Sequence, residues 1–327
     1  MNYKKIFGSI YFRVTVSLLL IGILVYQQDF KEIISSFENF DYKALLGGFI
    51  LLLFGTFLSA VRWKTILQTS NINLPVTYLY SLYLKGYFYN NFLPTQLGGD
   101  AYKSISLGNN IKDQSLSLFS VFMDRFAGLL VLLSVGMFGV ASLFGLEYVL
   151  AAVVMFVVGL LLYFPVLNIL AKKIKFFRKF RDASKLLVKD KKKGLLILLL
   201  SIGVQLASYA TNYVIFLGLG IKLPLWSVFA YLPITSLAIL IPSYNGIGTQ
   251  DYVYGELFKG ASIPANFSIA ASIVMHAIRF MMSIVGGLLI LFGLGNYKYI
   301  PHELQADTEE FNGSNNDTAK DLNVNAS

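Results

Sequence analysis

The sequence predicts an all-α protein with several membrane-spanning helices. Hydrophobic residues make up 56% of its 327 residues and charged residues 14%, whereas a soluble domain carries about 25% charged residues. The mean hydropathy is +0.63, and apolar runs long enough to cross a ~30 Å hydrocarbon core recur along the chain. These observations exclude a soluble enzyme, a secreted scaffold and a disordered protein.

Six long apolar runs are predicted to be full spans. They cover residues 10–26, 43–61, 115–144, 148–171, 194–217 and 265–294. The first run follows basic residues, as a signal peptide does, but no small-x-small cleavage site precedes the polar Gln27–Asp29 stretch. We therefore expect it to remain in the protein as a membrane helix.

Two further regions, 76–113 and 222–263, are apolar but interrupted near their centres. The interrupting residues are Pro94, Gly98 and Gly99 in the first region, and Pro233, Pro242, Gly246 and Gly248 in the second. Proline removes a helical donor and clashes with the preceding turn, so neither region should form one straight spanning helix. We expect two re-entrant hairpins, each entering and leaving by the same face; eight full spans are the alternative.

The distribution of positive charge favours the hairpins. Residues 172–193 contain eleven Lys or Arg residues against two Asp. If every segment crossed once, this run would lie outside the cell, against the preference of basic loops for the cytoplasm. With two hairpins it lies inside, and both termini are cytoplasmic. The halves then have the same order of segments in opposite orientation, which predicts an inverted repeat.

The composition also limits the chemistry. The chain has no Cys and only two His, and no HExxH, GxSxG or GxxxxGK[ST] sequence occurs. We therefore expect no metal and no cofactor. Residues 1–300 are expected to form a single membrane-embedded domain, and the polar, acidic residues 301–327 a disordered cytoplasmic tail.

The two interruptions carry the clearest motifs. The first runs from Asn90 to Asp100 and the second from Ile241 to Asp251. Each has Pro, then a pair of Gly residues that permit unusual backbone angles, then a carboxylate. Non-helical backbone at membrane depth is tolerated only where protein buries it or where it lines a wet cavity. A loop at the membrane interface is the plainer interpretation.

These blocks, with Asp124-Arg125 between them and Arg279 after them, resemble the lysylphosphatidylglycerol synthase transmembrane, or flippase-like, family. The likeness covers about residues 10–295. The family pattern has Arg where this chain has Lys103 and Glu where it has Asp251. Charge sign survives both changes, but Lys lacks the planar fork of Arg.

The resemblance implies that the chain handles lipids, moving aminoacyl phospholipids or polyprenyl-linked intermediates between leaflets of the cell membrane. The soluble synthase domain of some members is absent, so aminoacyl transfer by this chain alone is not expected. The candidate substrate-binding residues are Asn91, Pro94, Gly98, Gly99, Asp100, Lys103, Asp124, Arg125, Pro242, Asn245, Gly246, Gly248, Asp251, His276 and Arg279. No catalytic residue is expected.

The charges within the spans support this interpretation. An ionisable residue there costs about 3 kcal/mol or more, so it is usually paired or functional. Asp124 and Arg125 are adjacent on a helix and point about 100° apart, so each needs a partner from another element. Arg279, Asp100 and Asp251 are the candidates. His276 and Arg279, at i and i+3, share a face and could grip a phosphate, while buried pairs that fix helix register are the alternative. A further alternative is that His276 relays protons.

Two surface features complete the sequence analysis. Tyr residues surround Lys85, either as an aromatic belt at the interface or as a lining for a lipid head group. The basic, partly apolar run 172–193 suits an anionic lipid surface, and a simple topology anchor is the alternative. Nucleic-acid binding is not expected.

Two other functions remain open besides translocation. A membrane-embedded transferase acting on a polyprenyl phosphate could use Asp100, Asp124 and Asp251, although no close acidic pair is evident. A non-catalytic subunit of an envelope synthesis complex needs no chemistry of its own. A homo-oligomer and an envelope-synthesis partner are both compatible with the sequence.

Overall fold

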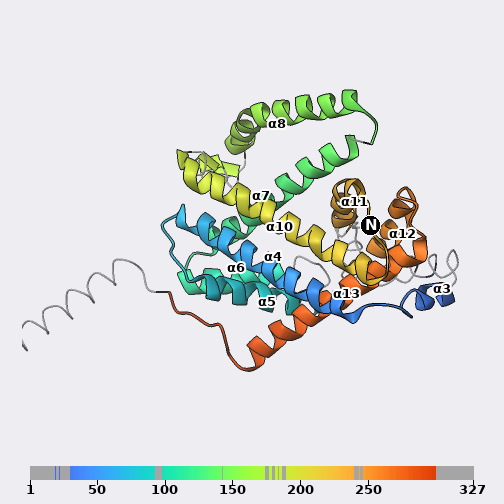
Figure 1. Cartoon of the computed structure of the whole chain (residues 1–327). Helices are drawn as coiled ribbons and strands as arrows, with labels where there is room; N and C mark the ends of the chain where they lie inside the picture. The colour runs from blue at the N-terminus through green and yellow to red at the C-terminus, as the bar shows by residue number, and fades with distance from the viewer. Residues whose placement is uncertain are drawn as a thin grey trace, which may run out of the picture. The chain divides into compact units, whose positions relative to one another are not determined.

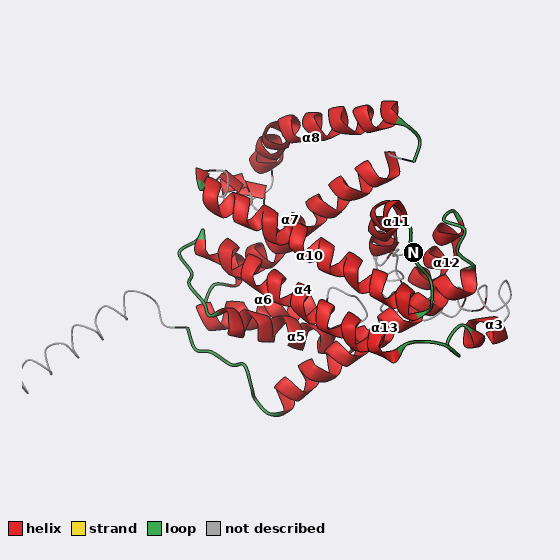
Figure 2. Ribbon diagram, in the orientation of Figure 1, coloured by secondary structure: helices red, strands yellow, loops and turns green. Residues whose placement is uncertain are grey.

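All the regular structure that the chain shows is helical. The structure, a computed structural model, describes residues 19, 22, 30–92, 98–141, 143–173, 177–178, 181–182, 184–185, 189–238, 243 and 246–299. Within these residues the secondary structure consists of helices joined by turns and loops (Figure 2). The predicted all-α class is confirmed. The predicted tail, residues 301–327, lies outside the described residues.

Five helices are long and apolar enough to cross a membrane (Figure 1). They are α4 (Tyr42–Gln68), α7 (Gln114–Ala141), α8 (Leu146–Lys173), α10 (Lys191–Gly218) and α13 (Ala265–Leu291). They confirm five of the six predicted spans; the run 10–26 falls mostly outside the described residues. A short helix, α3 (Phe30–Ser35), precedes α4.

One predicted boundary was wrong. The sequence placed the end of the second span at residue 61, but α4 continues to Gln68. Arg62 is 4% exposed, and Lys85 and Lys103 are also buried. Because these basic residues are buried, they do not indicate which side of the membrane is cytoplasmic. The topology argument therefore depends on residues 172–193.

Both interrupted regions form pairs of short helices. The first pair is α5 (Val76–Phe92) and α6 (Gly98–Ile111); the second is α11 (Leu225–Ala238) and α12 (Thr249–Lys259). The members of each pair pack against each other, and none reaches the ~20 residues that a span needs. The breaks are confirmed, with one correction. Pro233 lies inside α11, where it packs against Gly136 of α7, rather than at the break.

The two halves of the chain repeat one packing pattern. In chain order, α4, α5, α6 and α7 correspond to α10, α11, α12 and α13. Every pair of packed helices within this set has a counterpart: α5 packs on α13 as α11 packs on α7, and α6 packs on α7 as α12 packs on α13. The pair α4 and α10, which has the most extensive contact, is its own counterpart, as expected of two elements beside a pseudo-two-fold axis.

The register of α4 against α10 shows that these helices run antiparallel. Gly55 lies against Ala207 in the middle of both helices, where a Cβ on Gly55 would be 3.2 Å from that of Ala207. Towards one end Arg62 contacts Ser201, and towards the other Gly218 packs on Ala44. Small residues allow this close approach. Parallel helices would result if each segment crossed once, so the packing supports the two-hairpin, inverted-repeat topology.

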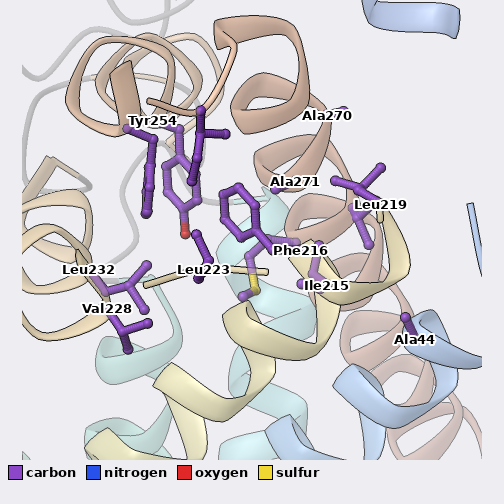
Figure 3. Close-up of a cluster of buried hydrophobic side chains, with 14 of the residues drawn as sticks. Ala44, Ile215, Phe216, Leu219, Leu223, Val228, Leu232, Tyr254, Ala270 and Ala271 are labelled. Carbon is purple, nitrogen blue, oxygen red and sulfur yellow. The ribbon is translucent and has the colours of Figure 1, made fainter. Parts of the chain in front are cut away.

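A buried apolar cluster fixes the second hairpin against the long helices (Figure 3). Phe216 of α10, Phe258 of α12 and Ile278 of α13 are fully buried within it. The rings of Phe216 and Phe258 have centroids 5.0 Å apart. Inside a bilayer such packing acts through van der Waals contact rather than through exclusion of water. The cluster therefore holds α12, and the acidic residue in its first turn, at a fixed place on α13.

The N-terminal end of α10 is capped. Asp190 accepts a hydrogen bond of 3.1 Å from the backbone N–H of Lys193. This backbone hydrogen bond lowers the pKa of the Asp190 carboxyl below its ordinary value. The ionised carboxylate of Asp190 offsets the positive partial charge of the helix N-terminus, where three consecutive lysines follow it.

Candidate functional site

Asp100 is the centre of a charged cluster in the first half. It lies in the first turn of α6, directly after the break between α5 and α6. Arg125 of α7 binds it with two hydrogen bonds, 2.6 Å from Nε to Oδ2 and 3.1 Å from Nη2 to Oδ1. Lys103, one turn along α6, lies 2.8 Å from the same carboxylate. The predicted pairing of Asp100 with Arg125 is present.

Asp124 has a different partner from those expected. Arg62 of α4 donates from Nε to Asp124 Oδ1 at 2.8 Å, and its Nη1 donates to Ser201 of α10 at 3.1 Å. The hydroxyl of Tyr83 donates to the other carboxylate oxygen of Asp124. This ion pair is almost completely buried, with side chains 5% and 2% exposed. It joins four helices, so it fixes their register.

Lys103 occupies an aromatic cage. Its ammonium lies 3.8 Å from the ring centroid of Tyr83 and 5.4 Å from that of Trp63. A compact ammonium fits between a carboxylate and two ring faces, where cation–π attraction adds to the ion pair. Lys103 is 2% exposed, so it orients Asp100 and does not face an open space. The replacement of the family's Arg by Lys at this position therefore affects how Asp100 is held, and not a group that faces a ligand.

Arg125 is the accessible cation of this cluster. Its side chain is 59% exposed, although both of its hydrogen bonds to Asp100 are made. It lies about 17 Å along an α7 of about 42 Å, close to the middle of a helix long enough to cross a membrane. A guanidinium facing hydrocarbon at this depth would cost about 3 kcal/mol or more. Its exposed area is therefore suited to water or to an anionic ligand.

A second charged cluster surrounds Asp251 in the other half. Gly246 and Gly248 adopt φ of 83°, a conformation that residues with a side chain rarely adopt. The turn they form brings Asp251 to the start of α12, where its carboxylate accepts from the Gly248 N–H at 2.9 Å. His276 of α13 lies 3.1 Å away, from Nε2 to Oδ1 of Asp251. The glycines are thus needed for the placement of the carboxylate.

Arg279, which the sequence offered as a candidate partner of Asp124, hydrogen-bonds to α12 instead. Its Nη1 donates to the Oε1 of Gln250 at 2.6 Å. His276 and Arg279 therefore share a face of α13, as predicted, and contact adjacent residues of α12. Gln250, a residue that sequence reasoning missed, supplies a neutral acceptor and leaves the positive charge of Arg279 without neutralisation by its hydrogen-bond partner.

The two clusters occupy equivalent positions in the repeat. Asp100 and Arg125 are 25 residues apart, and so are Asp251 and His276. In both halves the carboxylate lies in the first turn of the helix after the break. In both halves, its cationic or titratable partner is on the long helix that follows. We call these groups the first-half cluster (Arg62, Tyr83, Asp100, Lys103, Asp124 and Arg125) and the second-half cluster (Gln250, Asp251, His276 and Arg279).

The remaining predicted residues support the break in the first half. Asn91 donates to Ser283 of α13 at 2.7 Å. The backbone N–H of Gly99 donates to the side chain of Asn90 at 2.6 Å. Gly98 and Gly99 begin α6 and are buried. Three candidate residues, Pro94, Pro242 and Asn245, lie outside the described residues.

The carboxylates of both clusters are engaged by protein groups. Each of Asp100, Asp124 and Asp251 contacts a cation or His, and Asp251 accepts a backbone hydrogen bond as well. In the described part of the chain no three His, Asp or Glu residues lie together as ligands for a metal. The arrangement is that of a polar site between long apolar helices, in which the Arg125 guanidinium is largely accessible.

Comparison with known proteins identifies the family of the chain. Residues 10–287 match the family described as the lysylphosphatidylglycerol synthase TM region. A UPF0104 membrane protein of Pyrococcus horikoshii is 22% identical over 323 aligned residues, covering 86% of this chain and 96% of that protein. No solved structure gives a significant match. With the family match extending over most of the chain, the protein belongs to the lysylphosphatidylglycerol synthase transmembrane family.

Proposed function

We propose that this protein moves a lipid, or a lipid-linked intermediate, with an anionic head group between the leaflets of the cell membrane. The observation that carries the proposal is the accessible guanidinium of Arg125 near the membrane midplane, held by Asp100 at the end of a broken hairpin. A phosphate cannot cross hydrocarbon without compensation of its charge. A guanidinium offers two parallel donors that match phosphate oxygens.

The inverted repeat supports the proposal in a second way. Broken helices that meet at the interface of two such halves are the usual location of substrate sites in transporters. Here each half supplies one broken pair, and each break ends in a charged cluster. A site shared by the halves could open to either side in turn while the ion pairs within each half stay formed.

The experiment is reconstitution of the purified protein into liposomes. A panel of labelled lipids would include a zwitterionic phosphatidylcholine, phosphatidylglycerol, an aminoacyl phosphatidylglycerol and a polyprenyl phosphate sugar. Leaflet accessibility is measured over time. We expect faster exchange for at least one of the two anionic lipids, phosphatidylglycerol and the polyprenyl phosphate sugar, than in protein-free vesicles, with little effect on phosphatidylcholine. Equal rates with and without protein for every lipid would contradict the proposal.

The same experiment separates the alternatives. A transferase would convert a polyprenyl-phosphate lipid into a new product, which chromatography of the extracted lipids detects. A subunit without transport activity would give neither exchange nor product, while remaining folded.

A further inference from the structure

We propose that His276 is a proton-binding site coupled to the movement of the anionic head group. This inference rests on the translocation proposed above and names its co-substrate. The starting observation is the equivalence of the ion pairs Asp100–Arg125 and Asp251–His276, which have the same sequence separation and the same place in each half. One half has a guanidinium that is always protonated, and the other half has an imidazole at the equivalent position.

This difference makes one cluster switchable in charge. In the first-half cluster, the three cations Arg62, Lys103 and Arg125 exceed the carboxylates Asp100 and Asp124 by one, so its net charge is +1.

In the second-half cluster, Arg279 and Asp251 cancel when His276 is neutral, so the net charge is zero. Protonation of His276 raises it to +1. The two clusters then have the same net charge of +1. One proton on His276 therefore gives the second-half cluster the same net attraction for a singly charged anion as the first-half cluster has.

The geometry allows His276 to take up the proton. If Nε2–H donates to Asp251, the other ring nitrogen, Nδ1, is the one that accepts it. The imidazole is 16% exposed, whereas Asp251 is 8% exposed. The ring is therefore partly accessible, and the carboxylate beside it stabilises the imidazolium that forms.

The other charged groups around α13 do not replace His276 in this role. On α12 the neighbours are Asp251 and Tyr254, and on α5 Tyr87 lies close enough to interact with Arg279. Lys85 of α5 lies beside Gly286, about 15 Å along α13 from His276. Asn266 contacts the backbone of Glu32 on α3, a similar distance in the other direction.

The helices α4 and α10 approach this part of α13 with small and apolar residues. Gly48 of α4 lies against Ile278, and Thr211 and Ile215 of α10 lie beside Gly48. Arg62, the nearest charge of α4 in the clusters, is paired with Asp124. His276 is thus the member of the second-half cluster whose imidazole can bind and release a proton.

The proposed step balances in charge and in protons. His276 takes one proton from the water on one side, the singly charged head group binds, and the proton leaves His276 to water on the other side with the release of the head group. One anion and one proton move in the same direction, and the net charge transferred is zero. At zero membrane potential, a difference of one pH unit then drives up to about tenfold lipid asymmetry.

The test uses liposomes of phosphatidylcholine with a trace of labelled phosphatidylglycerol or of a labelled polyprenyl phosphate sugar, each with one negative charge, and with the potential clamped at zero by potassium and valinomycin. We expect the labelled anionic lipid to accumulate in the leaflet on the more alkaline side. His276→Gln should slow exchange tenfold or more at every pH. His276→Arg should exchange the lipid without pH-driven accumulation, and His302→Gln, at the other histidine of the chain, should behave like the unaltered protein.

Two results would overturn the inference while leaving translocation standing: exchange that ignores the pH gradient, or pH-driven accumulation that persists in His276→Arg. A complete absence of exchange would instead contradict the proposed function. In that case the inference is still tested by measuring the titration of His276, with NMR of the histidine-labelled protein in detergent. We expect phosphatidylglycerol or a polyprenyl phosphate to shift this titration to higher pH. No shift with either lipid would overturn the inference.

Discussion

Two arginines of the first-half cluster bind aspartates in different surroundings. Arg62 and Asp124 are sealed among four helices, whereas Arg125 remains largely accessible while it binds Asp100. A buried ion pair that loses one partner leaves an uncompensated charge in a low-dielectric interior. In the second pair Asp100 is also buried, but Lys103 remains beside it when Arg125 is removed, so this penalty is smaller. Of these two arginines, Arg62 therefore serves stability and Arg125 serves the ligand.

This division predicts that the same substitution reduces the free energy of unfolding by different amounts at the two positions. Arg62→Gln should reduce the free energy of unfolding by about 3–5 kcal/mol, because Asp124 is left buried and charged. Arg125→Gln should reduce it by less than about 1 kcal/mol. Thermal unfolding of both variants in one detergent is the measurement. Replacement of both Arg62 and Asp124 by Leu should recover much of the loss, and equal instability of Arg62→Gln and Arg125→Gln would contradict the assignment.

The partner of Asp124 could not be predicted from the sequence. Hydropathy ends the second span where the first charged residue appears, so Arg62 looks like the edge of a helix. Its burial depends on Asp124, 62 residues away, and on Tyr83 from the hairpin. Asp100 and Arg125 were recognisable because both lie next to sequence features, the Gly-Gly break and the Asp-Arg pair. Gln250 was missed because a neutral amide gives no signal within an apolar region.

At the level of elements, the hairpins depend on close backbone approach. Gly99 of α6 lies against Gly86 of α5, and a Cβ on Gly99 would be 2.6 Å from the Gly86 carbonyl oxygen. Backbone atoms cannot yield as the end of a flexible side chain can. The positions of Pro and Gly in the sequence made this break predictable. The residue that each glycine contacts depends on tertiary packing and could not be predicted.

Gly99→Ala should separate α5 from α6 and displace Asp100 from Arg125. We expect transport in the liposome assay to fall tenfold or more and stability to fall by about 1–3 kcal/mol. Gly159→Ala in α8 is the matched control, because no atom outside the helix lies within 4 Å of its Cβ position. Equal tolerance of Ala at both sites would show that the approach of the two helices is unimportant.

Gly248 tests the second hairpin by a different mechanism. Its φ of 83° is unfavourable for any residue with a Cβ, at a cost of about 1–2 kcal/mol for Ala. Gly248→Ala should therefore disturb the turn that holds Asp251 against His276. The expected results are slower lipid exchange and a loss of stability of that size, measured on the same protein preparation. Unchanged values of both would mean that this turn does not position Asp251.

For the whole molecule, the antiparallel contact of α4 and α10 defines the relation of the two halves. The chain has no Cys, so introduced pairs can be cross-linked without background. Gly55→Cys with Ala207→Cys should form a disulfide under mild oxidation, since the Cβ positions are 3.2 Å apart. Gly55→Cys with Ser201→Cys, about 9 Å along α10, should not. The reverse result would contradict the observed register.

The central claim is that the arginines beside the two breaks, Arg125 and Arg279, compensate the charge of a moving head group. Its most direct test is lipid exchange by Arg125→Gln, Arg279→Gln and the double variant, with unfolding measured on the same samples and Arg181→Gln as a surface control. The account predicts that each single variant stays folded and exchanges the lipid about thirtyfold more slowly, from a loss of about 2 kcal/mol of charge-assisted binding. Lys at either position should restore only part of the rate. Normal exchange by a stable double variant would contradict the account.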